Sequence, residues 1–288
     1  MKAGIDFGLT HVKAHWISTS GEYNLLSTMD GFDRRGLANE LRHRYGITVL
    51  CAAGNGPTDG FDWFPQHRLQ GDPLTLEIRT QASGAHRLLT THLRGSPIPH
   101  RYHLISVGTG VSYVFRNGDA YAPLLGSAFG AGAVDGLLAA VGIASGPRID
   151  ELLVDGPDEA SLDLMLAEAV PALKGTFYEA FTAAHFAKAA REPPAGQEAF
   201  DKLFASSVVN MLVVDAARSL LLHDRNPACR LVPDAAVAET VVLGTLPSRS
   251  RVVRRRLEKA LRMIGKDPIF PPHGEYALAV GAYHAIEI

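Results

Sequence analysis

The sequence has few cysteines, no strong charge of either sign and no long apolar run. Cys51 and Cys229 are its two cysteines, far apart and without metal-site spacing, so we expect reduced thiols and no disulfide framework. The 28 lysines and arginines nearly balance the 30 aspartates and glutamates, which predicts binding to neither nucleic acid nor a membrane. Apolar runs such as residues 137–144 are too short to cross a bilayer, and the N-terminus opens on a strand-like segment without a signal core. We therefore expect a cytoplasmic protein.

Strand-like and helix-like segments alternate along the chain. Hydrophobic residues make up 47 % and charged residues 20 %, which predicts a folded chain with a sizeable core. The strands expected in the first part are residues 2–6, 12–18, 23–29 and 47–53, with a helix at 37–45. After a linker-like segment at 94–101, a similar order begins again, with strands at 103–107 and 112–115 around a glycine turn.

This repetition predicts an α/β fold of two related units, with mixed sheets flanked by helices and a cleft between the lobes. We place the lobes at residues 1–97 and 98–288, with a helical insertion at about 147–224 in the second lobe. The other expected elements are strands at 74–76 and 241–243 and helices at 78–89, 252–264 and 275–285.

The first candidate site is the turn of residues 6–10, between two predicted strands. Gly8 lets the backbone turn tightly and approach an anion, because it lacks a Cβ atom. Thr10 adds a hydroxyl group. Asp6 suits hydrated Mg²⁺, which prefers one or two carboxylates together with phosphate oxygens. The alternative is an ordinary hairpin turn that Asp6 caps.

A second glycine turn, Gly108-Thr109-Gly110, lies between the strands at 103–107 and 112–115. Successive backbone N–H groups in such a turn form a concave anion site. A lone Gly-Thr-Gly also occurs in ordinary turns, so its weight comes from repeating the first turn. Two such turns on facing lobes would clasp a triphosphate.

A third glycine-rich stretch, residues 126–132, precedes a predicted helix. Gly130 and Gly132 would leave unpaired N–H groups at the helix N-terminus, where the helix dipole favours phosphate. The stretch lacks the Lys-Ser/Thr ending of a P-loop and does not follow a strand as tightly as a dinucleotide fingerprint does. The alternative is close helix packing that requires small residues.

Glu77 is the candidate general base. It lies between the apolar residues Leu74 and Leu76 and the predicted helix, where partial desolvation raises the proton affinity of a carboxylate. Phosphoryl transfer to an alcohol needs a group that accepts the hydroxyl proton. The alternative is a glutamate at a helix start, favoured there by the dipole.

Other chemistries have little support in the sequence. The twelve histidines form no cluster with metal-ligand spacing, and no serine lies in a nucleophile elbow. We expect the basic run from Arg249 to Lys259 to be a solvated helix face. The lesser alternative is a role near a nucleotide or at a contact between subunits.

The order of these motifs resembles the type II pantothenate kinases of the actin-like ATPase superfamily. Residues 4–13 are similar to the family's Gly-Ile-Asp-x-Gly-Gly-Thr-x-x-Lys, residues 77–84 to its Glu-φ-x-Ala-x-x-x-Gly, and residues 107–112 to its Val-Gly-Thr-Gly-x-Ser. The resemblance implies an actin-like (ribonuclease H-like) fold, with Glu77 as the catalytic base. It also implies that nucleotide phosphates and magnesium are bound by Asp6, Gly8, Thr10 and Lys13.

The resemblance continues along the rest of the chain. Residues 126–136, 181–186 and 274–283 are similar to later family segments, and Gly244 lies where the family has a contact on the adenosine side. Two positions depart from the pattern. Leu9 replaces the second glycine of the first turn, and Ala122-Pro123 stand where the family has an arginine that helps to bind pantothenate.

The resemblance therefore implies a homodimer that uses ATP and Mg²⁺ to phosphorylate pantothenate, early in coenzyme A synthesis. Two alternatives stay open. One is a related small-molecule or sugar kinase, since fold alone does not settle chemistry. The other is a regulator that binds nucleotide or acyl-CoA without catalysis, which Leu9 and the missing arginine favour and Glu77 disfavours.

Overall fold

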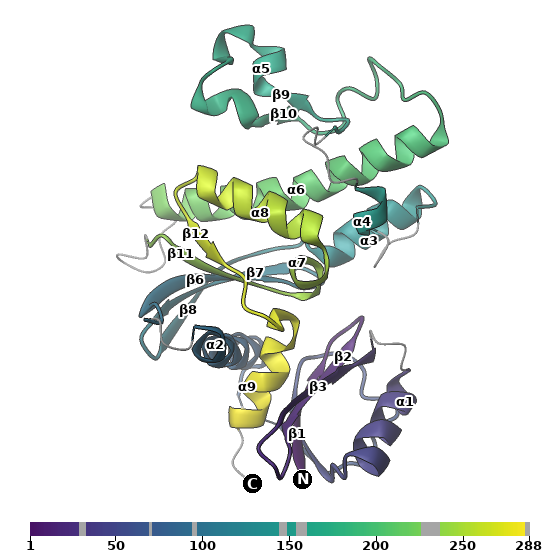
Figure 1. Ribbon diagram of the computed structural model, residues 1–288, viewed down its shortest axis with the longest axis vertical. Helices are drawn as coiled ribbons and strands as arrows, with labels where there is room; N and C mark the ends of the chain where they lie inside the picture. Colours follow the sequence, from purple (N-terminus) through teal and green to yellow (C-terminus); the bar gives the residue numbers. More distant parts are fainter. Residues whose placement is uncertain are drawn as a thin grey trace.

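Two five-stranded sheets, one above the other, form the body of the protein, with helices between them and on their outer faces (Figure 1). In the computed structural model, the described residues are 1–28, 33–68, 71–93, 97–143, 149–153, 160–225 and 237–285. The last residue of the strand predicted at 23–29 and the first three residues of the linker-like segment predicted at 94–101 lie outside the described residues.

The first sheet has the strand order β3-β2-β1-β4-β5. Its strands are β1 (Lys2–Phe7), β2 (Val12–Ile17), β3 (Tyr23–Ser27), β4 (Val49–Ala53) and β5 (Gln66–Arg68). β1, β2 and β3 pair antiparallel, whereas β4 runs parallel to β1 and β5 runs parallel to β4. Residues 3–7 of β1 are all buried, as expected of a central strand covered on both faces.

The second sheet repeats this topology. Its order, read from the antiparallel edge, is β8-β7-β6-β11-β12. The strands are β6 (Arg101–Val107), β7 (Val111–Asn117), β8 (Ala120–Ser127), β11 (Glu239–Leu243) and β12 (Asp267–Ile269). Again the first three pair antiparallel, and the last two run parallel to the first. The predicted duplication of an α/β unit with mixed sheets is therefore confirmed.

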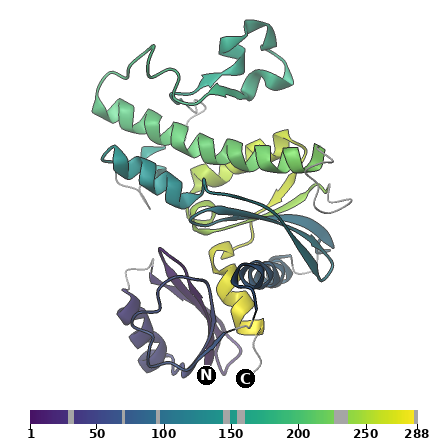
Figure 2. The same cartoon turned by 180° about the vertical axis from the view of Figure 1, so that it is seen from behind.

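Helices α2 (Pro73–His92) and α9 (Ala277–Ala285) lie between the two sheets and pack on each other (Figures 1 and 2). Their backbones touch, because a Cβ atom on Gly84 would lie 1.7 Å from Ala277 O and one on Gly281 would lie 1.9 Å from Thr80 O. α9 also packs on β1, β2 and β4, so the last helix of the chain covers the first sheet. A lobe boundary near residue 97 stays a prediction.

Most of the remaining helices cover the outer faces of the sheets, whereas α4 and α7 border the cavity between them. In chain order they are α1 (Arg34–Asn39) with its continuation η2 (Glu40–Arg44), α3 (Ala131–Ala140), α4 (Ile149–Leu152), α6 (Gln197–Arg225), α7 (Thr245–Arg249) and α8 (Arg251–Met263). The largest core cluster joins β6, β7 and β11 to α3, α6 and α8.

Residues 160–196 form an arm that extends beyond α6 (Figures 1 and 2). It contains β9 (Leu164–Met165), α5 (Leu166–Ala169), η3 (Pro171–Leu173), η4 (Phe177–Ala180) and β10 (Thr182–Ala184). The region predicted as a helical insertion thus holds a small two-stranded sheet that the sequence analysis did not predict, beside the long helix α6.

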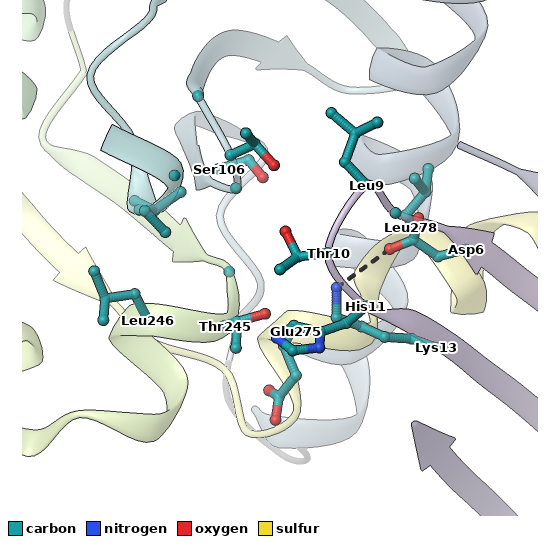
Figure 3. Close-up of a pocket in the computed structure, with 18 of the residues that line it drawn as sticks. Asp6, Leu9, Thr10, His11, Lys13, Ser106, Thr245, Leu246, Glu275 and Leu278 are labelled. Carbon is teal, nitrogen blue, oxygen red and sulfur yellow. Dashed lines mark hydrogen bonds and ion pairs between the residues drawn. The ribbon is translucent and has the colours of Figure 1, made fainter. Parts of the chain in front are cut away.

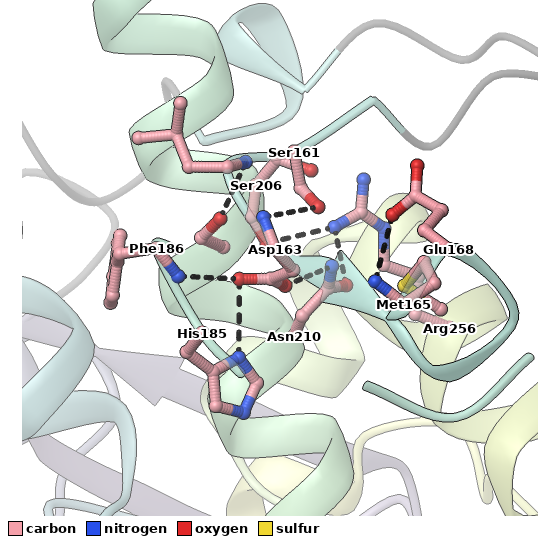
Figure 4. Close-up of polar contacts among 11 residues, drawn as sticks. Ser161, Asp163, Met165, Glu168, His185, Phe186, Ser206, Asn210 and Arg256 are labelled. Carbon is pink, nitrogen blue, oxygen red and sulfur yellow. Dashed lines mark hydrogen bonds and ion pairs between the residues drawn. The ribbon is translucent and has the colours of Figure 1, made fainter. Parts of the chain in front are cut away.

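Buried Asp163 fastens the arm to α6 (Figure 4). Its carboxylate accepts hydrogen bonds from Phe186 N at 3.2 Å and Asn210 Nδ2 at 2.9 Å, and His185 Nδ1 lies 3.2 Å away. Asn210 Oδ1 in turn accepts from Arg256 of α8 at 2.9 Å. Burial alone would raise the pKa of Asp163, but these hydrogen bonds outweigh it and lower the pKa.

Among the described helices, α6 alone is long and apolar enough to cross a membrane. Half of its apolar window is buried, and the helix packs against α3 and α8. This is the packing of a core helix.

Candidate functional site

A cavity of about 700 Å³ opens between the two sheets, at the ends of β1, β4, β6 and β11 (Figure 3). Ligands of α/β proteins bind outside the carboxyl ends of parallel strands. Both predicted glycine turns line this cavity, one from each sheet, and Glu77 and Gly244 line it as well. The structure therefore brings together most of the residues that the sequence analysis selected.

The first turn carries an ion pair at its base. Asp6 on β1 and Lys13 on β2 are opposite each other in the ladder, and Lys13 Nζ lies 3.4 Å from Asp6 Oδ2. Burial raises the pKa of Asp6 above its ordinary value, and the charge of Lys13 offsets only part of that shift. A second positive charge beside this carboxylate would further favour its ionised form.

Leu9 does not block the cavity. Its side chain is 66 % exposed at the tip of the first turn, beside the exposed Thr10. Its φ angle is not in the left-handed region, so the backbone here does not need a glycine at this position. Gly8 is different, because a Cβ atom on it would lie 2.5 Å from His11 O.

The second turn, Gly108-Thr109-Gly110, is also tight. Gly108 N donates to Gly110 O at 2.8 Å, and a Cβ atom on Gly110 would lie 2.8 Å from Ser127 O. Within the described residues, the amides of Leu9, Thr10 and Thr109 donate to no protein acceptor. They are therefore able to donate to an anion bound between the turns.

The third glycine-rich stretch acts differently from the prediction. The N–H groups of Ala131 and Gly132, at the start of α3, donate to Gly108 O at 2.8 Å and Thr109 O at 3.1 Å. They are not free for phosphate. A Cβ atom on Gly130 would lie 2.5 Å from the backbone of Gly110. The stretch supports the second turn from behind, which is the packing alternative, and Gly132 lines the cavity whereas Gly130 is buried.

Glu77 lies in the second turn of α2, not before the helix. The expected strand at 74–76 is wrong: α2 begins at Pro73, and its N-cap Asp72 accepts a hydrogen bond from Thr75 N at 2.8 Å. Burial first, and then the charge of Asp6, raise the pKa of Glu77. A half-buried carboxylate with a raised pKa, beside two anion-binding turns, has the properties of a general base.

Asn55 is a site residue that the sequence analysis did not select. Its Nδ2 donates to Glu77 Oε2 at 2.8 Å. It lies in the turn after β4, between Gly54 and Gly56, and no family motif marks it. Gly54 has φ +81° and lies against Phe7 O, at the end of β1.

The matching position in the second unit is Gly244, directly after β11. It has φ +117°, and a Cβ atom on it would lie 2.0 Å from Val107 O, at the end of β6. Glycine is needed at positions 54 and 244 because the backbone there has a positive φ and passes close to the end of the neighbouring strand, at Phe7 and Val107. Gly244 and Thr245 line the far wall of the cavity.

Charged and titratable residues also line the cavity. Arg249, at the end of α7, lies 3.5 Å from Glu275 Oε1 and lines the cavity. Its side chain is 47 % exposed, so this arginine is solvated as expected, and it also borders the cavity. His11 and Asp135 line the same cavity. Burial and then the charge of Lys13 lower the pKa of His11, which favours its neutral form.

The departure at Ala122-Pro123 lies on β8, away from this wall. These residues pair with Phe115 and Val114 on β7. They are not among the described residues that line the cavity. Another cation, such as Arg249, would have to serve an anionic group of a substrate.

The carboxylates suit a magnesium ion shared with phosphate. Asp6 and Glu77 lie close enough for one charge to shift the pKa of the other. Among the described residues no three His, Cys, Asp or Glu side chains form a metal cage. Mg²⁺ usually keeps several waters and takes one or two carboxylates plus substrate phosphates, so this donor set fits it.

Comparisons with known proteins identify the fold. No family model matches the sequence, and no curated protein matches it. The chain is similar to a protein from Sinorhizobium meliloti assigned as a 2-dehydro-3-deoxygalactonokinase, with 12 % identity, a TM-score of 0.51, and 99 % and 98 % of the two chains covered. It is also similar to a ROK-family glucokinase from Streptomyces griseus in complex with glucose and AMPPNP, with 12 % identity, a TM-score of 0.45 and the same coverage. The first of these shows that the chain shares its α/β fold, the predicted actin-like fold, with that protein.

Proposed function

We propose that the protein is a Mg-ATP-dependent kinase that phosphorylates a hydroxyl group of a small molecule. One observation carries this proposal: two glycine turns from different sheets and the carboxylate of Glu77 line one cavity. Catalysis of phosphoryl transfer depends mainly on positioning and electrostatic stabilisation. The turns would bind the phosphates, and the carboxylate would orient the attacking hydroxyl group. A cavity of about 700 Å³ has the size of a small-molecule ligand site.

Each residue has a role in this proposal. The amides of Leu9, Thr10 and Thr109 donate to phosphate oxygens, and Lys13 adds a positive charge at the first turn. Asp6 would hold Mg²⁺ through water, and the ion would neutralise charge on the phosphates when bound. Glu77 accepts the hydroxyl proton as the oxygen attacks the terminal phosphorus.

We consider two classes of phosphoryl acceptor. The S. meliloti protein is assigned to a sugar-acid substrate, so a sugar or sugar acid is the leading class. Pantothenate, with coenzyme A synthesis as its context, rests on the sequence motifs alone. The missing arginine at Ala122-Pro123 weakens it, because a charge-assisted contact contributes roughly 1.5–3 kcal/mol. Homodimer formation and acyl-CoA binding likewise rest on the resemblance.

The test measures ADP release with a panel of sugars, sugar acids and pantothenate. Glu77→Gln should lower kcat by about 10²–10⁴-fold, while Glu192→Gln, an exposed glutamate in the arm, should have no effect. In parallel, Mg-ATP should raise Tm, because a ligand at 100 times its Kd stabilises by about 2.7 kcal/mol. Stabilisation by nucleotide without ADP release for any acceptor would favour the regulator alternative. No stabilisation would contradict both.

A further inference from the structure

Asn55 connects the first turn to the candidate base. It is an exposed residue in the turn after β4, and its Nδ2 donates to Glu77 Oε2 at 2.8 Å. We propose that Asn55 is a positioning residue: it fixes the Glu77 carboxylate relative to the turn that holds the phosphates. This inference rests on the proposed function and names a further residue of the same site.

The backbone around Asn55 is held against the first turn. Gly56 N donates to Phe7 O at 2.6 Å, and a Cβ atom on Gly56 would lie 2.3 Å from Gly8 O. On the other side, a Cβ atom on Gly54 would lie 2.8 Å from Asp6 Oδ1. Both neighbours of Asn55 thus touch the strand end that carries Asp6 and Gly8, so the amide cannot move independently of that turn.

Two arginines strengthen this connection. Arg34 donates to Gly8 O at 3.4 Å and also to Pro57 O, so one guanidinium joins the first turn to the segment after Asn55. Arg68 of β5 donates to Gly54 O at 3.4 Å. The Asn55 turn is therefore held on both sides.

The backbone does not explain why residue 55 is asparagine. Asparagine is common in turns because it tolerates the left-handed region, but Asn55 has no positive φ. Its neighbours Gly54 and Gly56 meet the steric demands of the turn. Its side chain is exposed apart from its bond to Glu77, so a large part in stability is not expected. What remains for the amide is its hydrogen bond.

The bond has a chemical consequence. An amide nitrogen can only donate, so Glu77 must offer Oε2 as an acceptor, and Oε1 is left for the acceptor hydroxyl. α2 and the first turn belong to separate segments of the chain, and the Asn55 side chain joins them by a direct hydrogen bond to Glu77. A misplacement of about 1 Å at a reacting group can lower a rate about a hundredfold.

The test is a double-mutant cycle with Asn55→Ala and Glu77→Gln, measured with the best acceptor of the panel. We expect Asn55→Ala to lower kcat by about 10- to 100-fold, with the KM for Mg-ATP within about twofold of wild type and Tm within about 2 °C of it. In the Glu77→Gln background the same change should cost less than about threefold, because residues that act through one another are not additive. Asn24→Ala, which removes an amide on β3, is the matched control.

Asn55→Asp is the second variant. It keeps the shape of the side chain, removes the donor and adds a like charge beside Glu77, so its loss of kcat should be at least as large. Full additivity in the cycle, or unchanged kcat in both Asn55 variants, would overturn the positioning role while leaving the proposed function intact. If Glu77→Gln itself keeps wild-type activity, or no acceptor is phosphorylated, the proposed function fails and the inference fails with it.

Discussion

Asp6 and Lys13 face each other across the β1–β2 ladder, with Lys13 Nζ 3.4 Å from Asp6 Oδ2, at the base of the turn that enters the cavity (Figure 3). Both side chains are nearly buried, at 10 % and 12 % exposure. The pair thus holds one negative and one positive charge where a phosphate and its cation would bind. Its role in nucleotide binding can be tested separately from catalysis.

Lys13→Met should weaken Mg-ATP binding by about 10- to 150-fold, since a charge-assisted contact contributes roughly 1.5–3 kcal/mol. Isothermal titration with a non-hydrolysable ATP analogue and Mg²⁺ measures this. Lys174→Met, at an exposed position in the arm, is the control and should bind as wild type does. Equal affinity in both variants would place the phosphates away from the first turn.

Glu77→Gln should stabilise the unliganded protein near neutral pH. Burial and the charge of Asp6 raise the pKa of Glu77 in the folded state. The folded protein then binds this proton more tightly than the unfolded chain, so the glutamate lowers stability increasingly as pH rises through its folded pKa. Glutamine carries no such cost, and we expect a Tm about 1–3 °C higher than wild type at pH 7.5.

Urea unfolding of wild type and Glu77→Gln between pH 4 and pH 8 measures the difference in their free energies of unfolding. The advantage of the glutamine variant should grow with rising pH and shrink toward the ordinary pKa of glutamate, about 4.3. A variant less stable than wild type at pH 7.5 would show that Glu77 contributes to the fold through contacts that the glutamine does not replace.

Gly130→Ala and Gly136→Ala are a matched pair at the start and in the middle of α3. At Gly130 the new Cβ atom would meet the backbone of Gly110 at 2.5 Å, whereas at Gly136 nothing lies within 4 Å. We expect Gly130→Ala to lower both Tm and Mg-ATP affinity, because the second turn must shift. Gly136→Ala should stabilise by about 0.5–1 kcal/mol, the helix preference of alanine over glycine. A normal nucleotide affinity in Gly130→Ala would contradict the role of the second turn.

Gly84→Ala should destabilise the protein although it improves helix propensity. The added Cβ atom would lie 1.7 Å from Ala277 O, so α2 and α9 would have to separate, at a cost of about 1–3 kcal/mol. Chemical unfolding measures this cost, with Ser83→Ala in the same helix as the control. If Gly84→Ala is as stable as wild type, the two helices do not need to pack this closely.

The sequence predicts the repeated strands and both glycine turns because these depend on local patterns. Short apolar runs on either side of the glycine turns at residues 6–10 and 108–110 are typical of strand, turn and strand. The role of Glu77 as general base stays a prediction, and its helix begins earlier than the pattern predicts. Asp72 followed by Pro73 was the signal for the helix start, as an N-cap with proline at the first helical position.

Other features depend on contacts between distant segments. Asn55 meets Glu77 only because β4 ends beside the first turn, a pairing that no local pattern reports. Likewise the amides after Gly130 are used by Gly108 O and Thr109 O, which spacing alone cannot show. The arm at 160–196 lacks strong periodicity, and its fold depends on Asp163 and the residues around it.

The close crossing of α2 and α9 at Gly84 fixes the point about which α2 would tilt. Glu77 lies seven residues before that glycine on the same helix, or about 10 Å at a rise of about 1.5 Å per residue. If α2 tilted by roughly 5° about this crossing, the Glu77 carboxylate would move by about 1 Å. Substitutions at Gly84, which does not line the cavity, would then change turnover through the angle between the two helices.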